Sequence, residues 1–575
     1  MRQLRSLRPV IAAWLFLAAA CAQTIPSVPP PERQTQPAAE NAGPDPGSAY
    51  VAMDSWIYDA LDRLAAFGLI PSQISGLRPW TRAECRRQAL EAEEQLRKSL
   101  GEYARRPATD ELSELGVEAT SLVSALRSEL DSAGPAGSSI TLQSVYTRNG
   151  VIAGPALNDS FHFGQTWTGD NGRPFGRGWN SYTGFTASAE SGRFFAYVNG
   201  EYQRAPGSDP YSLAVRQAIS TMDSVPLQPA VARSDTSRFR TIEAYAGFRL
   251  GDLEFSIGKQ ALWWGPTYDA PLSFSNNAEP TKNLRVSTVH PLRLRFLGEV
   301  RAEFIIGKLG GQQYTWRPWF NAQKLSFKLT DNLEMGFTRW SIFWGVGHPI
   351  TLGSFIDNFI STTSPAGAAG VGANDPGDRK GGFDFRYRIP GLRNWLTLYS
   401  DSYCDDDPSP LASPRRSAIN PGIYLARVPG IAHLDFRVEA PSTTLLGLDN
   451  AINYDNDQYL SGNTNYGNLV GSWVGRDGRA EEAWATYRFS PRNKLELGFR
   501  QLKGSAKLIP GGTTQSDGSL ESSYMLSRGW SADVFVQYEK FYVPLLGPRR
   551  NNLSGWLQLT WEPNLQILRK GTEQK

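Results

Sequence analysis

The sequence predicts a mainly β fold: a transmembrane antiparallel β-barrel with a small N-terminal helical bundle on its periplasmic side. Three observations lead to this class. The chain opens with an export signal, and it is rich in aromatic residues (11%) and glycine (55 residues) although its mean hydropathy is −0.38. Apolar and polar residues then alternate through most of its length. An exported chain of this kind, without a long apolar run after its signal, is typical of membrane barrels.

Residues 1–22 have the pattern of a secretory signal peptide. Three arginines precede an apolar stretch, 10–20, which is too short to span a bilayer as a mature helix. Cleavage after Ala22 fits the small residues at this point. The alternative is a lipoprotein-type cleavage that leaves Cys21 as a lipidated first residue.

Residues 23–48 and 49–135 differ sharply in pattern. The first segment is polar and rich in proline, which predicts a disordered tether. In the second, apolar residues recur at three- and four-residue steps, as in 57–67, and Thr81 and Glu84 have the spacing of a capping box. We therefore expect a small periplasmic bundle of helices here.

Residues 139–562 change to a period of two, which is typical of β-hairpins. In "KLSFKLTDNLEMGFTRW" apolar residues alternate with polar ones on both sides of a Thr-Asp-Asn turn. The segment is long enough for roughly 16 to 18 membrane strands, and it exceeds what a soluble β sandwich, the rival fold, holds in one core. Short turns such as Gly251-Asp252 should face the periplasm. Residues 563–575 are expected to form a C-terminal tail.

Composition argues against several classes of function. The net charge is +3, and no basic cluster is concentrated enough to predict a nucleic-acid partner. Cys85 and Cys404 are expected in different compartments, so we predict no disulfide framework. The four histidines are scattered and no Gly-x-Ser-x-Gly motif occurs. The sequence therefore predicts a protein that is not an enzyme and needs no cofactor.

Candidate binding residues lie in "GKQALWWGPTYDAPLSFSNNAEP", residues 258–280. One hypothesis is a polysaccharide-binding surface, in which an indole stacks on a sugar ring and polar side chains bond to its hydroxyl groups. Its residues would be Lys259, Trp263, Trp264, Asn276 and Asn277. Because neighbours in a strand face opposite ways, one of the two tryptophans is expected in the lipid-interface girdle. The other hypothesis is a plug, in which this loop enters the barrel and its asparagines bond to backbone groups.

A run of acidic residues offers a weak candidate for a metal site. Asp405, Asp406 and Asp407 are adjacent in "YCDDDPSP". Clustered carboxylates can coordinate hard cations, but this spacing is not that of a calcium loop. A solvated loop at the barrel rim is therefore the preferred interpretation, and no metal is predicted.

Several motifs together resemble the capsule assembly Wzi family. They are "SWIYDALDRLAAFGLI" with "LRPWTRAE", "GKQALWWGP" with "SFSNNAEP", "YCDDDPSP", "NPGIYLARVPGIAHLDFRVE" and "GSWVGRDG". The resemblance runs from about Tyr50 to Trp561. It implies an 18-stranded outer-membrane barrel with a periplasmic helical bundle, acting as a lectin-like anchor for capsular or other surface polysaccharide.

This resemblance also implies partners, and rival functions stay open. The expected partners are surface polysaccharide, outer-membrane lipid and lipopolysaccharide. The first helical segment further resembles a single S-layer homology repeat, which would suggest contact with the cell wall. The rivals are an outer-membrane diffusion porin, for which a polar lumen is also expected, and an outer-membrane hydrolase.

Overall fold

The computed structural model describes residues 46–103, 111–131, 137–360, 377–392, 395–405, 410–411, 414–445 and 453–571. The predicted signal peptide and almost all of the predicted tether lie outside these residues.

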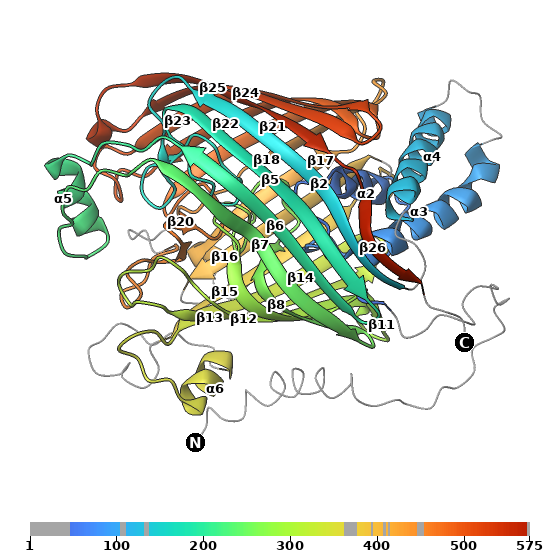
Figure 1. Cartoon of the computed structure of the whole chain (residues 1–575), viewed down its shortest axis with the longest axis horizontal. Coiled ribbons are helices and arrows are strands. Elements are labelled where there is room, and N and C mark those ends of the chain that lie inside the picture. The colour runs from blue at the N-terminus through green and yellow to red at the C-terminus, as the bar shows by residue number, and fades with distance from the viewer. Residues whose placement is uncertain are drawn as a thin grey trace.

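A closed antiparallel β-barrel forms the body of the molecule (Figure 1). Its strands are β2 (Gly137–Ile152), β5 (Gly178–Ser191), β6 (Phe194–Ala205), β7 (Thr236–Leu250), β8 (Leu253–Gln260), β10 (Thr281–Thr288), β11 (Leu292–Leu294), β12 (Gly298–Lys308), β13 (Trp319–Thr330), β14 (Leu333–Phe343), β15 (Asp378–Arg388), β16 (Leu396–Asp405), β17 (Ser417–Leu425), β18 (Leu434–Glu439), β21 (Gly478–Ser490), β22 (Asn493–Gly504), β23 (Thr513–Ser527), β24 (Trp530–Tyr542), β25 (Arg550–Trp561) and β26 (Leu565–Gly571). β10 and β11 both pair with β12, and β25 and β26 both pair with β2. Counting each couple as one interrupted strand, the described wall has 18 strands, which confirms the predicted fold class.

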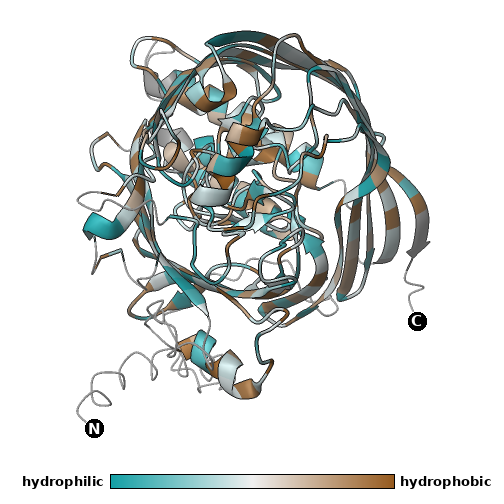
Figure 2. Ribbon diagram, turned by 90° about the vertical axis from the view of Figure 1, so that its left-hand side faces the viewer, coloured by the Kyte–Doolittle hydropathy of each residue, from teal (hydrophilic) through white to brown (hydrophobic). Residues whose placement is uncertain are grey.

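Side chains along each wall strand alternate between the lumen and the outside, as the period of two predicts. In β22, Leu497 and Phe499 are 58% and 49% exposed on the outer face. The flanking Glu496 and Arg500 face the lumen, where both have hydrogen-bond partners. Figure 2 shows the resulting alternation of hydrophobic and hydrophilic residues around the ring of strands. An outer face of exposed apolar side chains is what a barrel presents to lipid.

Helices of the N-terminal segment lie at one end of the barrel (Figure 1). They are α2 (Trp56–Ala66), α3 (Arg82–Tyr103) and α4 (Glu111–Leu130). Their apolar faces pack together and against Tyr399 and Tyr424 of the wall. At the start of α3 the backbone N–H of Glu84 donates to the Thr81 hydroxyl oxygen at 3.1 Å, so the predicted cap is present. In the described ranges, no helix combines the length and the apolar character needed to cross a membrane.

The helices share their end of the barrel with the short turns. Arg492, in the turn between β21 and β22, holds its guanidinium 5.3 Å from the ring centre of Trp56. Arg63 of α2 is fully buried and donates to Glu118 of α4 at 2.5 Å and to Asp435 of β18 at 3.0 Å. These ion pairs and the shared apolar cluster dock the bundle on the barrel mouth.

Segments from both ends fill part of the lumen. From the helix end, Ser75 and Gly76 reach the wall, and their backbone N–H groups donate to Glu334 at 3.0 and 2.7 Å. From the opposite end, the connections 153–177, 261–280 and 453–477 fold inward. Two of these connections contain a short strand pair: β3 (Asn158–Asp159) with β4 (Gly164–Gln165), and β19 (Thr464–Asn465) with β20 (Asn468–Leu469). In the third, β9 (Trp263–Trp264) pairs with β1 (Leu77–Arg78) of the N-terminal segment. We call these inward segments the plug.

The prediction that residues 563–575 form a C-terminal tail is wrong for those of them that the structure describes. Residues 565–571 form β26, which pairs with β2 and completes the wall at the helix end. Asn564 has a φ of +45°, so the last strand is interrupted at this residue rather than ended. Beyond it Ile567 is 59% exposed, as an outward-facing wall residue would be.

Candidate functional site

The stretch 258–280 leaves the barrel wall after Gln260 and crosses the lumen. Its two tryptophans form β9, which pairs with β1 of the N-terminal segment and not with a wall strand. Gly265 has a φ of +149°, and a Cβ there would lie 2.8 Å from Pro271. Only glycine suits such a conformation and such a close approach. The chain can therefore turn inward at this residue.

Trp264 lies in the core of the plug. Its side chain is fully buried, and its indole N–H donates to Glu303 of β12 at 2.9 Å. The ring of Phe274 packs edge-on at 5.0 Å. The prediction that one of the two tryptophans belongs to the lipid-interface girdle is wrong, because Trp263 is also inside the barrel and only 4% exposed. Alternation along a strand predicts the side of a residue only while the chain stays in the wall.

Lys259 and Asn277 are held by protein partners. The ammonium of Lys259 donates to the Glu279 carboxylate and to the backbone oxygen of Thr241. The side-chain amide of Asn277 donates to the backbone oxygen of Leu469 at 3.1 Å. Both side chains are buried. These contacts fit the hypothesis that the loop enters the barrel and that its asparagines bond to backbone groups.

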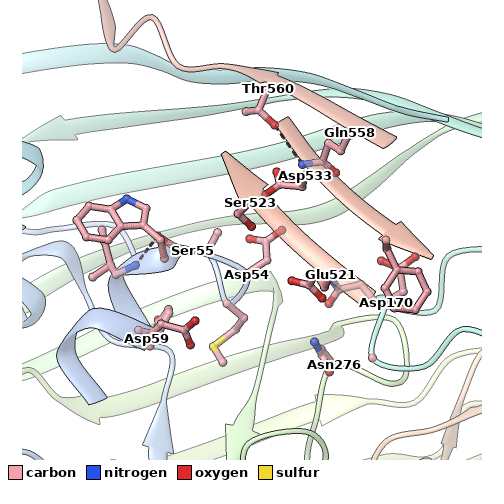
Figure 3. Close-up of a pocket in the computed structure, with 18 of the residues that line it drawn as sticks. Asp54, Ser55, Asp59, Asp170, Asn276, Glu521, Ser523, Asp533, Gln558 and Thr560 are labelled. Carbon is pink, nitrogen blue, oxygen red and sulfur yellow. Dashed lines mark hydrogen bonds between the residues drawn. The ribbon is translucent and has the colours of Figure 1, made fainter. Parts of the chain in front are cut away.

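Trp263 and Asn276 instead line a lumenal cavity of about 630 Å³. The cavity lies between the start of α2, the connection 167–173 and the lumenal faces of β21 to β25 (Figure 3). The indole N–H of Trp263 and the side-chain oxygen of Asn276 have no hydrogen-bond partner within the described part of the chain. Both atoms are themselves buried, so a polar ligand in the cavity would reach them only if these side chains turned toward it.

Carboxylates from distant parts of the chain surround this cavity. Asp54 and Asp59 come from the start of α2, and Glu521 and Asp533 come from β23 and β24 (Figure 3). Burial opposes the charged form of Asp59, but Lys494 and neighbouring arginines outweigh it and hold the pKa of this carboxyl well below its usual range. The cavity wall also contains aromatic rings, so it can bind water or a molecule rich in hydroxyl groups.

Sequence reasoning missed most residues of this cavity. Asp533 and Glu521 sit at lumen-facing positions of wall strands, which the alternation marks as polar and inward. The alternation alone does not place them beside Asp54, which is far away in the sequence. Only the docking of α2 against this part of the wall brings the groups together.

An exposed aromatic side chain marks the outer surface of the plug. Tyr466, in the turn between β19 and β20, is 52% exposed and has a φ of +51°. Its backbone N–H donates to Gly310 at 2.8 Å, and the N–H of Gly310 donates to the side chain of Asn465 at 2.7 Å. A Cβ on Gly310 would lie 2.4 Å from the tyrosine ring. One face of the ring therefore rests on the backbone at Gly310, and the other face is exposed. The only sign of this turn in the sequence is the polar stretch "NTNYGN".

A buried histidine joins two connections at the end of the barrel opposite the helices. His162 follows β3, and its ring nitrogens lie 2.8 Å from carboxylate oxygens of Asp159 and of Asp223. Asp223 caps the helix α5 (Leu213–Met222), which lies in the connection between β6 and β7. Burial disfavours the charged imidazole, but the two carboxylates outweigh it and raise the pKa of His162 to about 9. The ion pairs therefore tie α5 to the plug.

The acidic run does not form a shared metal site among the described residues. Asp405 ends β16, is 1% exposed and pairs with Lys380 at 3.0 Å. Asp406 and Asp407 lie outside the described residues. Within the described ranges, no group of three or more His, Cys, Asp or Glu side chains could hold a metal ion.

Comparison with protein families finds one matching model. Its description is "Capsule assembly protein Wzi", and it matches residues 147–553. The match begins within β2 and ends within β25, so it covers nearly all of the wall together with the inward connections.

Individual proteins similar to this chain include one from Klebsiella pneumoniae, described as an uncharacterized 55.8 kDa protein in the cps region. It is 25% identical over 244 residues, which cover 40% of this chain and 46% of that protein. The chain therefore spans about half the length of this curated relative.

Among solved structures, the chain is similar to Wzi of Escherichia coli, described as an outer membrane protein involved in group 1 capsule assembly and as a carbohydrate-binding β-barrel. The TM-score is 0.63 at 15% identity, and the alignment covers 90% of this chain and 100% of that one. At this identity the likeness establishes the fold. OccD3 (OpdP) of Pseudomonas aeruginosa aligns with a TM-score of 0.41 at 10% identity, covering 75% of this chain and 92% of its own.

Proposed function

The chain belongs to the capsule assembly protein Wzi family, and we propose on this basis that it is an outer-membrane barrel that binds carbohydrate and anchors or organises capsular or other surface polysaccharide. The observation that carries the proposal is the family match over residues 147–553. Its action is binding rather than catalysis. The similar fold of the carbohydrate-binding barrel from Escherichia coli supports the same function.

The orientation in the membrane follows from the two ends of the barrel. Outer-membrane barrels place their short turns in the periplasm and their long loops outside the cell. The helical bundle shares the short-turn end, so it lies in the periplasm. There the exposed charged face of α3, which includes Glu94 and Arg97, is free to contact the cell wall. The outer apolar band contacts membrane lipid, with lipopolysaccharide in the outer leaflet.

The plug argues for an anchor and against a diffusion porin. A porin needs a continuous water-filled path, whereas here the segments of the plug cross the lumen. Charged lumenal side chains are also paired with each other: Lys324 binds Asp384, and Arg500 binds Asp517 at 2.5 Å. We therefore expect no large, steady single-channel currents in a planar bilayer, and such currents would favour the porin instead.

Tyr466 is an exposed aromatic group placed to contact polysaccharide outside the cell. Its exposed ring can stack on a sugar face, and the polar residues around it can bond to hydroxyl groups. Trp263 and Asn276 remain candidate sugar contacts inside the lumenal cavity. Trp264, Asn277 and Lys259 act in folding the plug, because their polar groups already bond to protein.

A deletion strain tests this function. We expect polysaccharide to move from the cell-attached fraction to the medium, with total production unchanged and with recovery on re-expression of the wild-type chain. Tyr466→Ala should recover less retention than Tyr202→Ala, a matched control that is 45% exposed on the outer wall. Unchanged retention in the deletion strain would refute the function. Equal behaviour of the two variants would refute only the placement of the sugar contact.

A further inference from the structure

Helix α6 (Leu352–Ile360) lies on the outside of the barrel, in the connection between β14 and β15 (Figure 2). Phe359 packs edge-on against Phe304, an outward-facing residue of β12, at 5.8 Å. Phe355 lies 6.2 Å from Phe343, at the outer end of β14. The helix is therefore seated on the outer wall and not over the lumen.

A wall arginine fixes the end of this helix. Arg339 faces outward from β14 and donates to the backbone oxygen of Asn358 at 2.7 Å and to that of Phe359. The last carbonyl groups of a helix carry partial negative charge, so a guanidinium there is favourable. The contact holds α6 flat against the wall strands.

The polarity of α6 is the reverse of that expected for a helix in water. Its buried side chains are the polar Ser354 and Asn358, which are 3% and 0% exposed. Leu352 is 74% exposed, and Ile356 and Ile360 are each 41% exposed. A helix on a soluble surface turns its apolar stripe inward. Here the apolar stripe faces away from the protein.

The buried polar side chains of α6 make hydrogen bonds within the protein. The indole N–H of Trp344 donates to the Ser354 hydroxyl oxygen at 2.8 Å. The side-chain amide of Asn358 donates to the backbone oxygen of Ser354 at 2.9 Å. These bonds hold the polar side of the helix against the protein, so its apolar side chains are left on the opposite side.

We propose that α6 is an interfacial membrane helix, whose apolar side chains insert among the acyl chains of the outer leaflet. These side chains continue the outer apolar surface of the wall, where Phe337 of β14 is 39% exposed. A helix of this length extends about 13 Å, too short to span a bilayer core of about 30 Å. It therefore lies along the membrane surface, as amphipathic helices do.

Neighbouring side chains have the composition of a membrane interface. The ammonium of Lys308 lies 4.4 Å from the ring centre of Trp319, and the guanidinium of Arg317 lies 4.0 Å from that of Trp316. Tryptophans and long cationic side chains gather where acyl chains meet headgroups. Lys308 ends β12, Trp319 begins β13, and Trp316 and Arg317 lie in the connection between them. The ring of Trp319 lies 5.7 Å from that of Trp344, in the connection that bears α6.

Spin labelling of the full-length protein in phosphatidylcholine vesicles tests this proposal. A nitroxide on Ile356→Cys should collide with dissolved oxygen and little with a water-soluble nickel complex. Leu497→Cys, on the outer wall, is the lipid reference, and Val231→Cys, 71% exposed beyond α5, is the water reference. Cys85 and Cys404 are buried, so labelling of the unmodified protein supplies the blank.

Each outcome of this experiment decides the proposal. A ratio of oxygen to nickel collisions at Ile356 close to that at Leu497 supports it. A ratio close to that at Val231 overturns it, and so does spin–spin broadening at Ile356, which would mean that a second copy covers the helix. The proposal rests on the membrane placement of the proposed function but not on carbohydrate binding. Nickel access at Leu497 itself would refute that placement, and so the two failures are distinguishable.

Discussion

Replacing Trp264 should open the plug without unfolding the barrel wall. This side chain is fully buried, packs edge-on with Phe274 and donates its indole N–H to Glu303. It also lies in β9, the strand that joins the inward loop to the N-terminal segment. The two substitutions Trp264→Ala and Trp264→Phe separate its packing from its hydrogen bond.

The expected magnitudes follow from burial and hydrogen bonding. Truncating a fully buried tryptophan to alanine costs about 3–5 kcal/mol. Trp264→Phe keeps most of the ring and loses one hydrogen bond to a charged group, which costs about 1.5–3 kcal/mol. Glu303 retains Arg285 at 3.7 Å, so neither substitution leaves this carboxylate without a cation nearby. The free energy of opening of the plug should fall by these amounts.

Amide hydrogen exchange in detergent micelles measures this opening free energy for residues 261–280, because local opening is reported segment by segment. Trp264→Ala should speed exchange there by about 10²- to 4 × 10³-fold, with wall strands unchanged. The control is Trp316→Ala, whose side chain is 53% exposed and should matter little. If Trp264→Ala exchanged no faster than Trp316→Ala, the assignment of Trp264 to the plug core would be refuted.

Three further outcomes are expected. Arg63→Met should loosen the helical bundle by about 3–5 kcal/mol, because it breaks a buried ion pair, whereas Arg97→Met, at an exposed pair, should have no measurable effect; equal protease resistance of the two variants would contradict the docking. The folded pKa of His162, about 9, lies above its unfolded value near 6.5, so its stabilisation of α5 should be complete below about pH 6.5 and lost as pH rises through about 9. The opening free energy of α5 in His162→Gln, obtained from exchange rates corrected for the intrinsic pH dependence of amide exchange, should not vary over this window. An unchanged pH dependence would show that another group is responsible. Gly310→Ala should displace the Tyr466 ring and reduce polysaccharide retention as Tyr466→Ala does, and wild-type retention would contradict the role of the ring.

Much of the fold was predictable because its signals are local. The period of two along β13 and β14, with Ser326 and Glu334 on the polar face, identifies wall strands without any knowledge of their neighbours. In the structure both side chains face the lumen, and the Glu334 carboxylate accepts a hydrogen bond from Ser75 of the N-terminal segment. Helical periodicity and the cap at Thr81 likewise locate α2 and α3, because helix contacts lie only three and four residues apart.

The candidate site was only partly predictable. The sequence identified 258–280 as a loop that either binds polysaccharide or enters the barrel as a plug. In the structure this loop lies inside the barrel as part of the plug. Of its polar residues, Lys259 and Asn277 turned out to bond to Glu279 and to the chain near Leu469. Glu279 belongs to the same loop, but Leu469 lies on another connection and Thr241, the second partner of Lys259, lies on β7. No local pattern could therefore distinguish a loop that meets sugar from one that meets protein.

The sequence by itself determined the strands of the wall, their alternating faces and the helices, because each depends on neighbours a few residues away. Only the tertiary structure decided what fills the lumen: where Trp263 and Trp264 leave the wall, which carboxylates surround the cavity, and that α6 turns its apolar side outward. The cavity brings together segments as far apart as those of Asp54 and Asp533, and α6 is held by Arg339, 19 residues before its partner Asn358. Such contacts depend on the closure of the barrel, which places distant connections in one enclosed space.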